Sequence, residues 1–389
     1  MAAYYEFQNP VKICSGDQAL EHIPYELRSL GVSRPLLLSD ATLSRLGLCD
    51  LVERASGLRP PRFDDIAPDS SLDTVRRAAA RYRQEGCDCI IALGGGSVLD
   101  TGKGVAMVEA HGGIDPMELI GCEELTAGAA VPLLAIPTTA GTGSEATSVA
   151  VIAHPEKDVK LEFISAHIQP QVAFLDPRLT VKLPPAITAA TAMDALCHAV
   201  EAFTCLQKNP VSDGYAIAAL RLIVRRLPEV VAHPGSAQVR LDLANASLIA
   251  GAAFSNSMVG GVHAIGHALG GVCHVPHGQA MAILLPHVMR YNLDACAQTY
   301  AELLLHLAGP DRYAATPADQ RAAQAVEAVE ALRDFLHATC QLPLRLSQVG
   351  VAQADLPRVA EKALSDGAML FNPVAMDQND VVALLNRAM

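Results

Sequence analysis

The chain has 389 residues, of which 51% are hydrophobic and 18% charged, a balance typical of a folded globular protein. Its formal net charge of -12 would repel phosphate backbones, and the sequence contains no basic run, so nucleic acid is not an expected partner. The N-terminal sequence does not resemble a signal peptide, and every apolar run is interrupted before membrane-spanning length, so we expect a soluble, cytoplasmic protein with no membrane partner.

The first half of the chain alternates short apolar runs with amphipathic stretches. Residues 34–40 predict a buried strand, and residues 71–86 predict a helix that ends at Gly86. Two further strands are predicted within residues 87–97 and 131–139, each running into a turn. Strands that alternate with helices indicate a parallel sheet with helices on both faces. The predicted buried face of the helix consists of Leu72, Val75, Ala79 and Tyr82.

The pattern changes at about residue 185 to long runs rich in alanine and leucine. Residues 212–227 and 319–340 are examples, and each predicts a long helix. Paired prolines within residues 179–188 interrupt the earlier pattern. We therefore predict an α/β domain over residues 1–184 and an all-helical domain over residues 185–389.

The first glycine-rich turn is LGGGSVLDTGK, residues 93–103, between a predicted strand and a predicted helix. Its backbone N–H groups and the positive end of the helix dipole suit a phosphate group. The segment matches neither the GxGxxG dinucleotide fingerprint, because position 99 is Leu99, nor a Walker A loop, because position 97 is Ser97. Taken alone, it is equally consistent with an ordinary tight turn.

A second turn, PTTAGTGSE at residues 137–145, also follows a predicted strand and is rich in hydroxyl groups. Two such turns at the carboxyl ends of parallel strands fit a pyrophosphate and its sugars. Asp40 ends an early strand, where a carboxylate accepts hydrogen bonds from a ribose diol and repels a 2′-phosphate, which favours NAD over NADP. The alternative for Asp40 is an ordinary turn residue or helix N-cap.

Histidines gather in GGVHAIGHALGGVCHVPHG, residues 260–278, which holds four of the 13 in the chain. Upstream, residues 191–203 predict a helix with a carboxylate and an imidazole one turn apart. A carboxylate with several imidazoles suits Fe²⁺ or Zn²⁺ better than Mg²⁺ or Ca²⁺. A single histidine is more often a satisfied core residue, but the group predicts a metal site. Spacing alone does not choose four ligands among Asp194, His198, His263, His267, His274 and His277. No glutamate lies between His263 and His267, which argues against a zinc protease.

Five segments taken together resemble the iron-containing (group III) alcohol dehydrogenase family: GGGSVLDTGK, PTTAGTGSE, TAMDALCHAVEAF, GGVHAIGHALGG and VPHGQAMAILLPHVMRYN. They follow the order and spacing of the family, and the similarity runs from about residue 7 to the C-terminus. The resemblance implies an N-terminal dinucleotide-binding domain, a helical C-terminal domain and a metal between them, the architecture shared with dehydroquinate synthase. One departure is Ala192, where family members commonly have glycine.

The resemblance also implies roles for individual residues. The metal ligands would be Asp194, His198, His263 and His277, and His267 would be a candidate proton relay. The pyrophosphate loop would comprise Gly95, Gly96, Ser97 and Asp100, and further nucleotide contacts would be Thr138, Thr139, Ser144 and Lys160. Asp40 stands where members that prefer NAD tend to carry aspartate. His274 has no role in the family pattern.

The implied activity is that of an NAD(H)-linked, Fe²⁺- or Zn²⁺-dependent alcohol dehydrogenase or aldehyde reductase, with a small alcohol, diol or aldehyde as substrate. Apolar walls from Phe254, Val262 and Leu269 would favour short aliphatic substrates, although these residues could equally belong to the core. The alternatives are a hydroxyacid-oxoacid transhydrogenase on the same scaffold, a non-catalytic sensor, and a lyase of the dehydroquinate synthase type. The lyase is disfavoured because the segments around the histidines contain almost no basic residues for an anionic substrate.

The apolar N-terminus, with Tyr4, Tyr5 and Phe7, fits an edge strand that pairs with a second subunit, or the first strand of the chain's own sheet. We expect a homo-oligomer, a dimer or a larger assembly.

Overall fold

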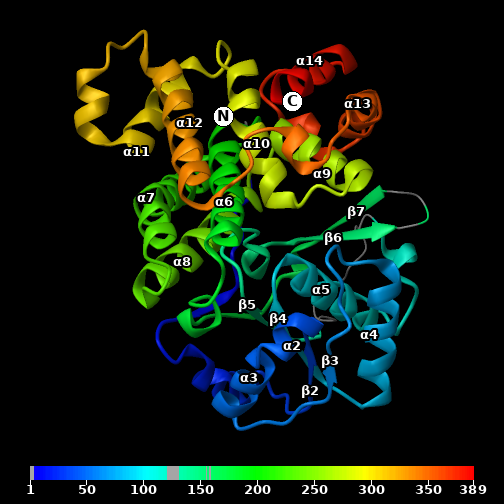
Figure 1. Ribbon diagram of the computed structural model, residues 1–389. Coiled ribbons are helices and arrows are strands. Elements are labelled where there is room, and N and C mark those ends of the chain that lie inside the picture. The colour runs from blue at the N-terminus through cyan, green and yellow to red at the C-terminus, as the bar shows by residue number, and fades with distance from the viewer. Residues whose placement is uncertain (1–3, 121–130, 155, 157–158) are drawn as a thin grey trace. The chain divides into compact units, whose positions relative to one another are not determined.

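The computed structural model describes residues 4–120, 131–154, 156 and 159–389, and the chain forms two compact units (Figure 1). One unit is Gln8–Lys182. The other combines the N-terminal segment up to Phe7 with Leu183–Met389. In the described residues, no helix combines the length and the apolar character needed to cross a membrane.

A six-stranded sheet forms the centre of Gln8–Lys182, in the order β1-β8-β5-β4-β2-β3, and all its strand pairs are parallel. The predicted strands are confirmed. Most of these strands are buried along their length, as expected for a parallel sheet covered on both faces. The strands are β1 (Lys12–Ser15), β2 (Pro35–Leu38), β3 (Arg62–Phe63), β4 (Cys89–Gly94), β5 (Leu133–Pro137) and β8 (Val172–Leu175).

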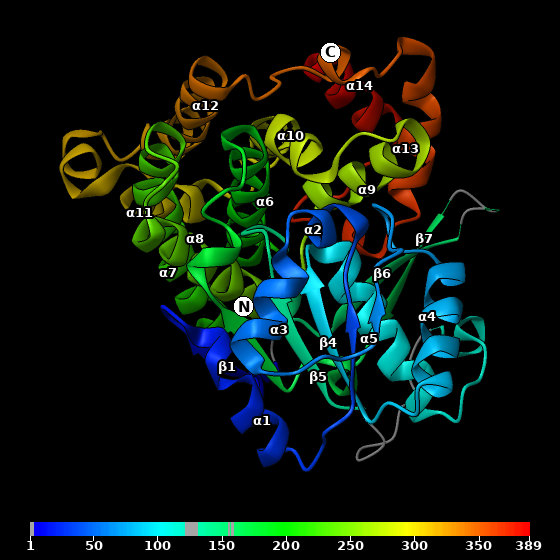
Figure 2. The same cartoon turned by 60° about the horizontal axis from the view of Figure 1, so that its bottom comes forward.

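Helices cover both faces of this sheet, as predicted (Figure 2). Alternate residues along each strand point to opposite faces. Leu36 and Ile90 therefore join one core with α4 (Leu72–Gln84) and α5 (Gly96–Ala110), whereas Leu37 and Ile91 join the other, with α1 and α3. The remaining helices of this unit are α1 (Ile23–Ser29), α2 (Ala41–Arg45) and α3 (Leu48–Ser56), with the 3-10 helices η1 (Ala19–His22), η2 (Pro116–Leu119), η3 (Ser144–Ala146), η5 (Ala166–Ile168) and η6 (Pro177–Leu179).

Helix α4 shows how closely local sequence dictates local structure. The Ser71 side chain caps its first turn by accepting a hydrogen bond of 3.2 Å from the Thr74 backbone N–H. All four residues of the predicted apolar face are buried. The apolar periodicity and the stop at Gly86 therefore located this helix to within two residues.

A two-stranded antiparallel sheet, β6 (Val149–His154) and β7 (Val159–Ile164), was not predicted. Its register pairs Val149 with Ile164 and Ala153 with Lys160. The hairpin begins three residues after the end of η3, so it follows the second glycine-rich turn along the chain almost directly.

The second unit is helical, as predicted (Figure 1). Pro184 and Pro185 do not merely interrupt the chain but start helix α6, because a proline in the first turn sacrifices no helical hydrogen bond. The helices are α6 (Pro185–Thr204), α7 (Pro210–Ala232), α8 (Ala237–Phe254), α9 (Gly261–Cys273), α10 (His277–Tyr291), α11 (Ala297–Ala315), α12 (Arg321–Cys340), α13 (Leu356–Leu364) and α14 (Gln378–Ala388), with the 3-10 helices η7 (Leu346–Val349), η8 (Gln353–Asp355) and η9 (Gly367–Phe371).

The prediction that Tyr4, Tyr5 and Phe7 form the first strand of the chain's own sheet was wrong. Tyr4 and Tyr5 are exposed and belong to no strand, and the edge strand of the large sheet is β1, further along the chain. The Phe7 ring lies 5.2 Å, centroid to centroid, from the Tyr215 ring of α7. Phe7 thus packs against a helix, and the pairing of this segment with a second subunit stays a prediction. The homo-oligomer remains a prediction.

Candidate functional site

The two glycine-rich turns lie side by side at the carboxyl edge of the large sheet. Gly94 pairs with Pro137 in the register of β4 and β5, and the Thr138 backbone N–H donates to the Gly94 carbonyl at 3.0 Å. Gly95 is the N-cap of α5, and no side chain caps that end of the helix. The first N–H groups of α5 therefore remain available to an anion at this edge.

The predicted nucleotide residues on these turns are brought together by side-chain contacts. The Ser144 hydroxyl donates to Asp100 Oδ1 at 2.7 Å. Lys160 Nζ donates to Asp69 Oδ1 at 2.8 Å, and the Asp69 backbone N–H donates to Ser97 Oγ at 3.1 Å. Thr138 is buried, whereas Thr139 is half-buried beside Gly95. The structure thus gathers these residues, and their contact with a nucleotide remains a prediction.

Lys103, which sequence reasoning did not select, is fully buried below these turns. Burial lowers the pKa of its ammonium group from 10.5 to about 8. Burial also raises the pKa of two neighbouring carboxyls, Asp100 and Glu145, and the pKa of Glu145 reaches about 7. A group of ionisable side chains that is shielded from water, Lys103, Asp100 and Glu145, therefore lies beneath the turns.

Asp40 takes the ordinary role that was its alternative interpretation. One oxygen, Oδ1, caps α2 by accepting from the Thr42 and Leu43 backbone N–H groups at 2.8 and 2.9 Å. The residue follows β2, which neighbours β4, so it lies at the same edge of the sheet as the first turn. Its role in recognising a ribose stays a prediction.

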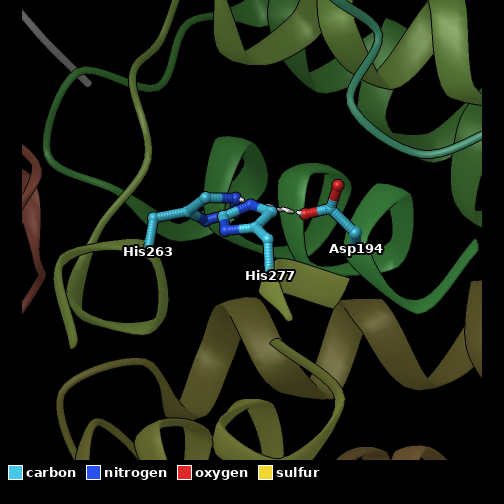
Figure 3. A group of neighbouring side chains, drawn as sticks. All are labelled: Asp194, His263 and His277. Carbon is cyan, nitrogen blue, oxygen red and sulfur yellow. Dashed lines mark ion pairs between the residues drawn. The ribbon is translucent and has the colours of Figure 1, made fainter. Parts of the chain in front are cut away.

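In the helical unit, a carboxylate and three imidazoles converge. Asp194 and His198 lie on one face of α6, His263 lies in the first turn of α9, and His277 is the first residue of α10. Asp194 Oδ1 lies 3.3 Å from His277 Nε2, 3.6 Å from His263 Nε2 and 3.8 Å from His198 Nε2. Figure 3 shows the His263 and His277 rings directed at the Asp194 carboxylate.

The burial of this group distinguishes it from a set of satisfied core histidines. Asp194, His198 and His263 are nearly inaccessible. Asp194 Oδ1 and His263 Nε2 are buried atoms without a hydrogen-bond partner in the described residues. Leaving such atoms unsatisfied is costly. Asp194, His263 and His277 offer ligand atoms within 4.8 Å of one another, and His198 Nε2 lies near the same Asp194 oxygen. One carboxylate oxygen with several imidazole nitrogens fits a borderline divalent cation such as Fe²⁺.

Glu201 supports this group and was missed by sequence reasoning. Its carboxylate accepts from the Val262 backbone N–H at 2.8 Å and contacts His263 Nδ1. This contact fixes the His263 ring so that Nε2 faces Asp194. Glu201 follows Asp194 by seven residues and His198 by three, so it lies on the same face of α6, and that spacing was the available signal.

For Asp194 and His263, the neighbouring charged side chains shift the pKa in the direction opposite to the shift that burial causes. Although burial raises it, the pKa of Asp194 is held well below its usual value by His198 and His277. Burial lowers the pKa of His263, but Glu201 and Asp194 outweigh that effect and raise it to about 10. Burial keeps the pKa of His277 below its usual value. Without a metal, the two carboxylates thus favour a proton on His263, and a bound cation would displace that proton.

His267 lies beside the group formed by Asp194, His198, His263 and His277, and it contacts a different carboxylate, that of Asp366. Its Nδ1 hydrogen-bonds Asp366 Oδ2 at 2.9 Å, and its ring stacks on that of His277 at 5.5 Å between centroids. Burial raises the pKa of Asp366, but the hydrogen bond from His267 outweighs it and keeps the pKa below its usual value. His274 is exposed and ends α9 in a left-handed conformation.

The three apolar residues considered as substrate walls have different environments. Val262 and Leu269 are buried core residues. The half-buried Phe254 ring stacks on the His198 ring with 4.2 Å between centroids. Of the three, Phe254 is the one whose ring lies against a proposed metal ligand, His198.

Comparison with known proteins gives consistent matches along the chain. The family described as "Iron-containing alcohol dehydrogenase" matches residues 10–177, and "Fe-containing alcohol dehydrogenase family, C-terminal" matches residues 188–389. The 1,3-propanediol dehydrogenase of Klebsiella pneumoniae is 38% identical over 378 residues, which cover 96% of each chain. The NAD-dependent methanol dehydrogenase of Bacillus methanolicus is 35% identical, covering 96% of this chain and 97% of that one. A crystal structure of 1,3-propanediol oxidoreductase superposes with a TM-score of 0.93 at 36% identity, covering 99% of this chain and 100% of that chain.

Proposed function

Because the chain belongs to the iron-containing alcohol dehydrogenase family, a family of oxidoreductases, we propose that it interconverts short-chain alcohols or diols and their aldehydes with NAD(H). The balanced reaction converts R–CH₂OH and NAD⁺ into R–CHO, NADH and a proton. The NAD-dependent methanol dehydrogenase among the relatives supports the cofactor. That protein and the 1,3-propanediol dehydrogenase support a small alcohol or diol as substrate.

The observation that carries this proposal is the convergence of Asp194, His198, His263 and His277. Within the part of the chain that the structure describes, two of the buried atoms at their centre, the Oδ1 of the aspartate and the Nε2 of His263, have no hydrogen-bond partner. We propose that these four side chains hold Fe²⁺. When bound, such a cation supplies Lewis-acid polarisation of the substrate oxygen, and the nicotinamide supplies the hydride chemistry.

The protein's own residues have three tasks in this proposal. The N–H groups at the start of α5 and the hydroxyls of the second turn bind the pyrophosphate of the nucleotide. Glu201 keeps the His263 ring in the orientation that a cation requires. Phe254 excludes water from one side of His198 and contacts the apolar part of a short substrate.

His267 is the proposed proton carrier. With Nδ1 donating to Asp366, the imidazole is oriented so that Nε2 accepts the proton lost from the alcohol hydroxyl. The Asp366 carboxylate stabilises the imidazolium that forms. In the direction of aldehyde reduction the same nitrogen returns the proton.

The test is anaerobic NADH oxidation with propionaldehyde, first with metal-stripped protein and then after adding Fe²⁺ or, separately, Zn²⁺. We expect turnover only after metal is added, and its loss in His263→Ala. The control is His274→Ala, which removes an exposed imidazole from the same segment. Equal turnover with and without metal would contradict the proposal. Hydride exchange between a hydroxyacid and an oxoacid without release of NADH would instead indicate a transhydrogenase.

A further inference from the structure

The Lys103 side chain, in the second turn of α5, has no exposed surface. A buried ammonium group is costly unless each of its protons has an acceptor. Nζ donates to Ser144 Oγ at 2.8 Å, Thr147 Oγ1 at 2.8 Å and the Val149 carbonyl at 2.6 Å. These three bonds use all three ammonium protons, so the group has no donor left for a ligand.

One acceptor, Ser144, lies in the second glycine-rich turn and the other two follow it directly, whereas α5 starts in the first turn. Lys103 therefore connects the two turns below the surface. Asp100 makes the same connection, because Oδ1 accepts from Ser144 Oγ at 2.7 Å and Oδ2 accepts from the Val151 backbone N–H at 3.1 Å. Asp100 Oδ1 lies 3.9 Å from Lys103 Nζ, close enough to offset the buried positive charge.

The turns are also in close contact above this connection. A Cβ atom added to Gly96 would lie 2.9 Å from Thr142 Cγ2, and one added to Gly95 would lie 3.4 Å from Thr139 Oγ1. At Gly96 the spacing between the turns thus leaves no room for an extra carbon, whereas at Gly95 an added Cβ would make an ordinary contact. A shift of either turn would alter the edge at which a pyrophosphate would bind.

We propose that Lys103 is a positioning residue for nucleotide binding, which holds the two glycine-rich turns at a fixed spacing. Asp100 and Ser144 act with it through their mutual contacts, and the effect of Lys103 on the nucleotide is indirect. This inference rests on the proposed function, because it assumes that the turns bind NAD(H).

The test is the equilibrium binding of NADH and of ADP-ribose to wild type and to Lys103→Met, a side chain of similar length without donors. Because the turns hold the pyrophosphate, we expect the Kd of both ligands to rise by about tenfold or more. The metal content should be unchanged, and kcat at saturating NADH should stay within about threefold while KM for NADH rises. The split between KM and kcat is an effect that general loss of stability would not produce.

Two control variants separate positioning from destabilisation and from loss of charge. Val52→Ala removes buried methyl groups from the core on the opposite face of the sheet, and Lys182→Met removes an exposed ammonium group. Both should bind NADH as wild type does. If Lys103→Met does not fold, Thr147→Val removes a single acceptor and should raise the Kd in the same direction.

A double-mutant cycle of Lys103→Met and Ser144→Ala tests the joint action. We expect strongly non-additive effects on the Kd of NADH, since either change breaks the same connection. Additive effects, or a Kd for Lys103→Met within about twofold of wild type, would overturn the inference. If wild-type protein itself fails to bind NADH, the proposed function fails rather than the role of Lys103.

Discussion

At the scale of single residues, Glu201 shows what the sequence could and could not reveal about the metal-type site. Its place on the same face of α6 as Asp194 and His198 follows from helical spacing. Its partner His263 lies 62 positions further along the chain, and no periodicity reports that contact. The candidate ligands were thus predictable as residue types in a motif, whereas the residues that orient them required the fold.

Replacing Glu201 tests whether the orientation of His263 matters for metal binding. In Glu201→Gln we expect metal affinity to fall by about 10- to 100-fold, the usual effect of losing a partner of a ligating histidine. Metal per chain is measured by mass spectrometry after dialysis against graded chelator. Glu229→Gln, an exposed glutamate on α7, is the matched control. Equal metal retention in Glu201→Gln and in wild type would show that Glu201 does not support the ligand.

Glu145 makes a prediction about pH. It is buried, its Oε1 has no hydrogen-bond partner in the described residues, and burial raises its pKa from 4.5 to about 7. The folded protein therefore keeps a proton that the unfolded chain releases. This contribution to stability is present below pH 4.5 and is lost as pH rises through 7.

In Glu145→Gln that loss should be absent. Relative to wild type, the unfolding free energy of the variant should increase by roughly 3 kcal/mol between pH 4 and pH 8, at 1.36 kcal/mol per pKa unit. Urea unfolding of the nucleotide-free protein across this range measures the difference. Glu118→Gln, which removes an exposed carboxylate, should follow wild type. A difference for Glu145→Gln that does not change with pH would disprove the assignment.

At the scale of elements, the packing of α10 against α6 brings His277 to Asp194. Gly278 follows His277 directly, and a Cβ atom added there would lie 2.5 Å from the Ala190 carbonyl oxygen of α6. Backbone cannot yield as a flexible side chain can. The close approach of the two helices therefore depends on this glycine.

We expect Gly278→Ala to lower the unfolding free energy by about 1–3 kcal/mol, as overpacking does, and to weaken metal binding by moving His277. Gly214→Ala in α7 is the control, since nothing lies within 4 Å of its added Cβ. That change should instead stabilise the protein by roughly 0.5–1 kcal/mol, through helix propensity. Denaturant unfolding measures the unfolding free energy of both variants. Equal changes of the same sign in the two variants would contradict the role of Gly278.

Local patterns predicted some elements better than others. Helix α4 carries a complete apolar face and a capping serine, so its sequence alone located it. The hairpin β6–β7 was missed because β6 is alternately buried and half-buried, and its neighbours decide that pattern. Tyr4–Phe7 is not a strand of the chain's own sheet, and sequence did not reveal this because an aromatic residue that packs on a helix, as Phe7 does, looks the same as one in a strand.

At the scale of the whole molecule, the two units contribute different parts of the proposed chemistry. Gln8–Lys182 carries the two turns proposed to bind the nucleotide, and Leu183–Met389 carries the proposed metal ligands and His267. The change from alternating strands and helices to continuous helices was visible in sequence because it is a change of period. The buried contacts beneath the turns, between segments more than 40 residues apart, were not.

The measurement that tests the central claim most directly follows the hydride itself. Protein reconstituted anaerobically with Fe²⁺ is given propionaldehyde and NADH that carries deuterium at the transferable position of C4, and the propanol formed is analysed by mass spectrometry. We predict one deuterium at the carbinol carbon in the product of the metal-loaded protein, and no propanol from the metal-stripped protein. Metal-loaded protein that binds NADH but forms no labelled propanol, or stripped protein that forms it equally well, would contradict a metal-dependent hydride transfer.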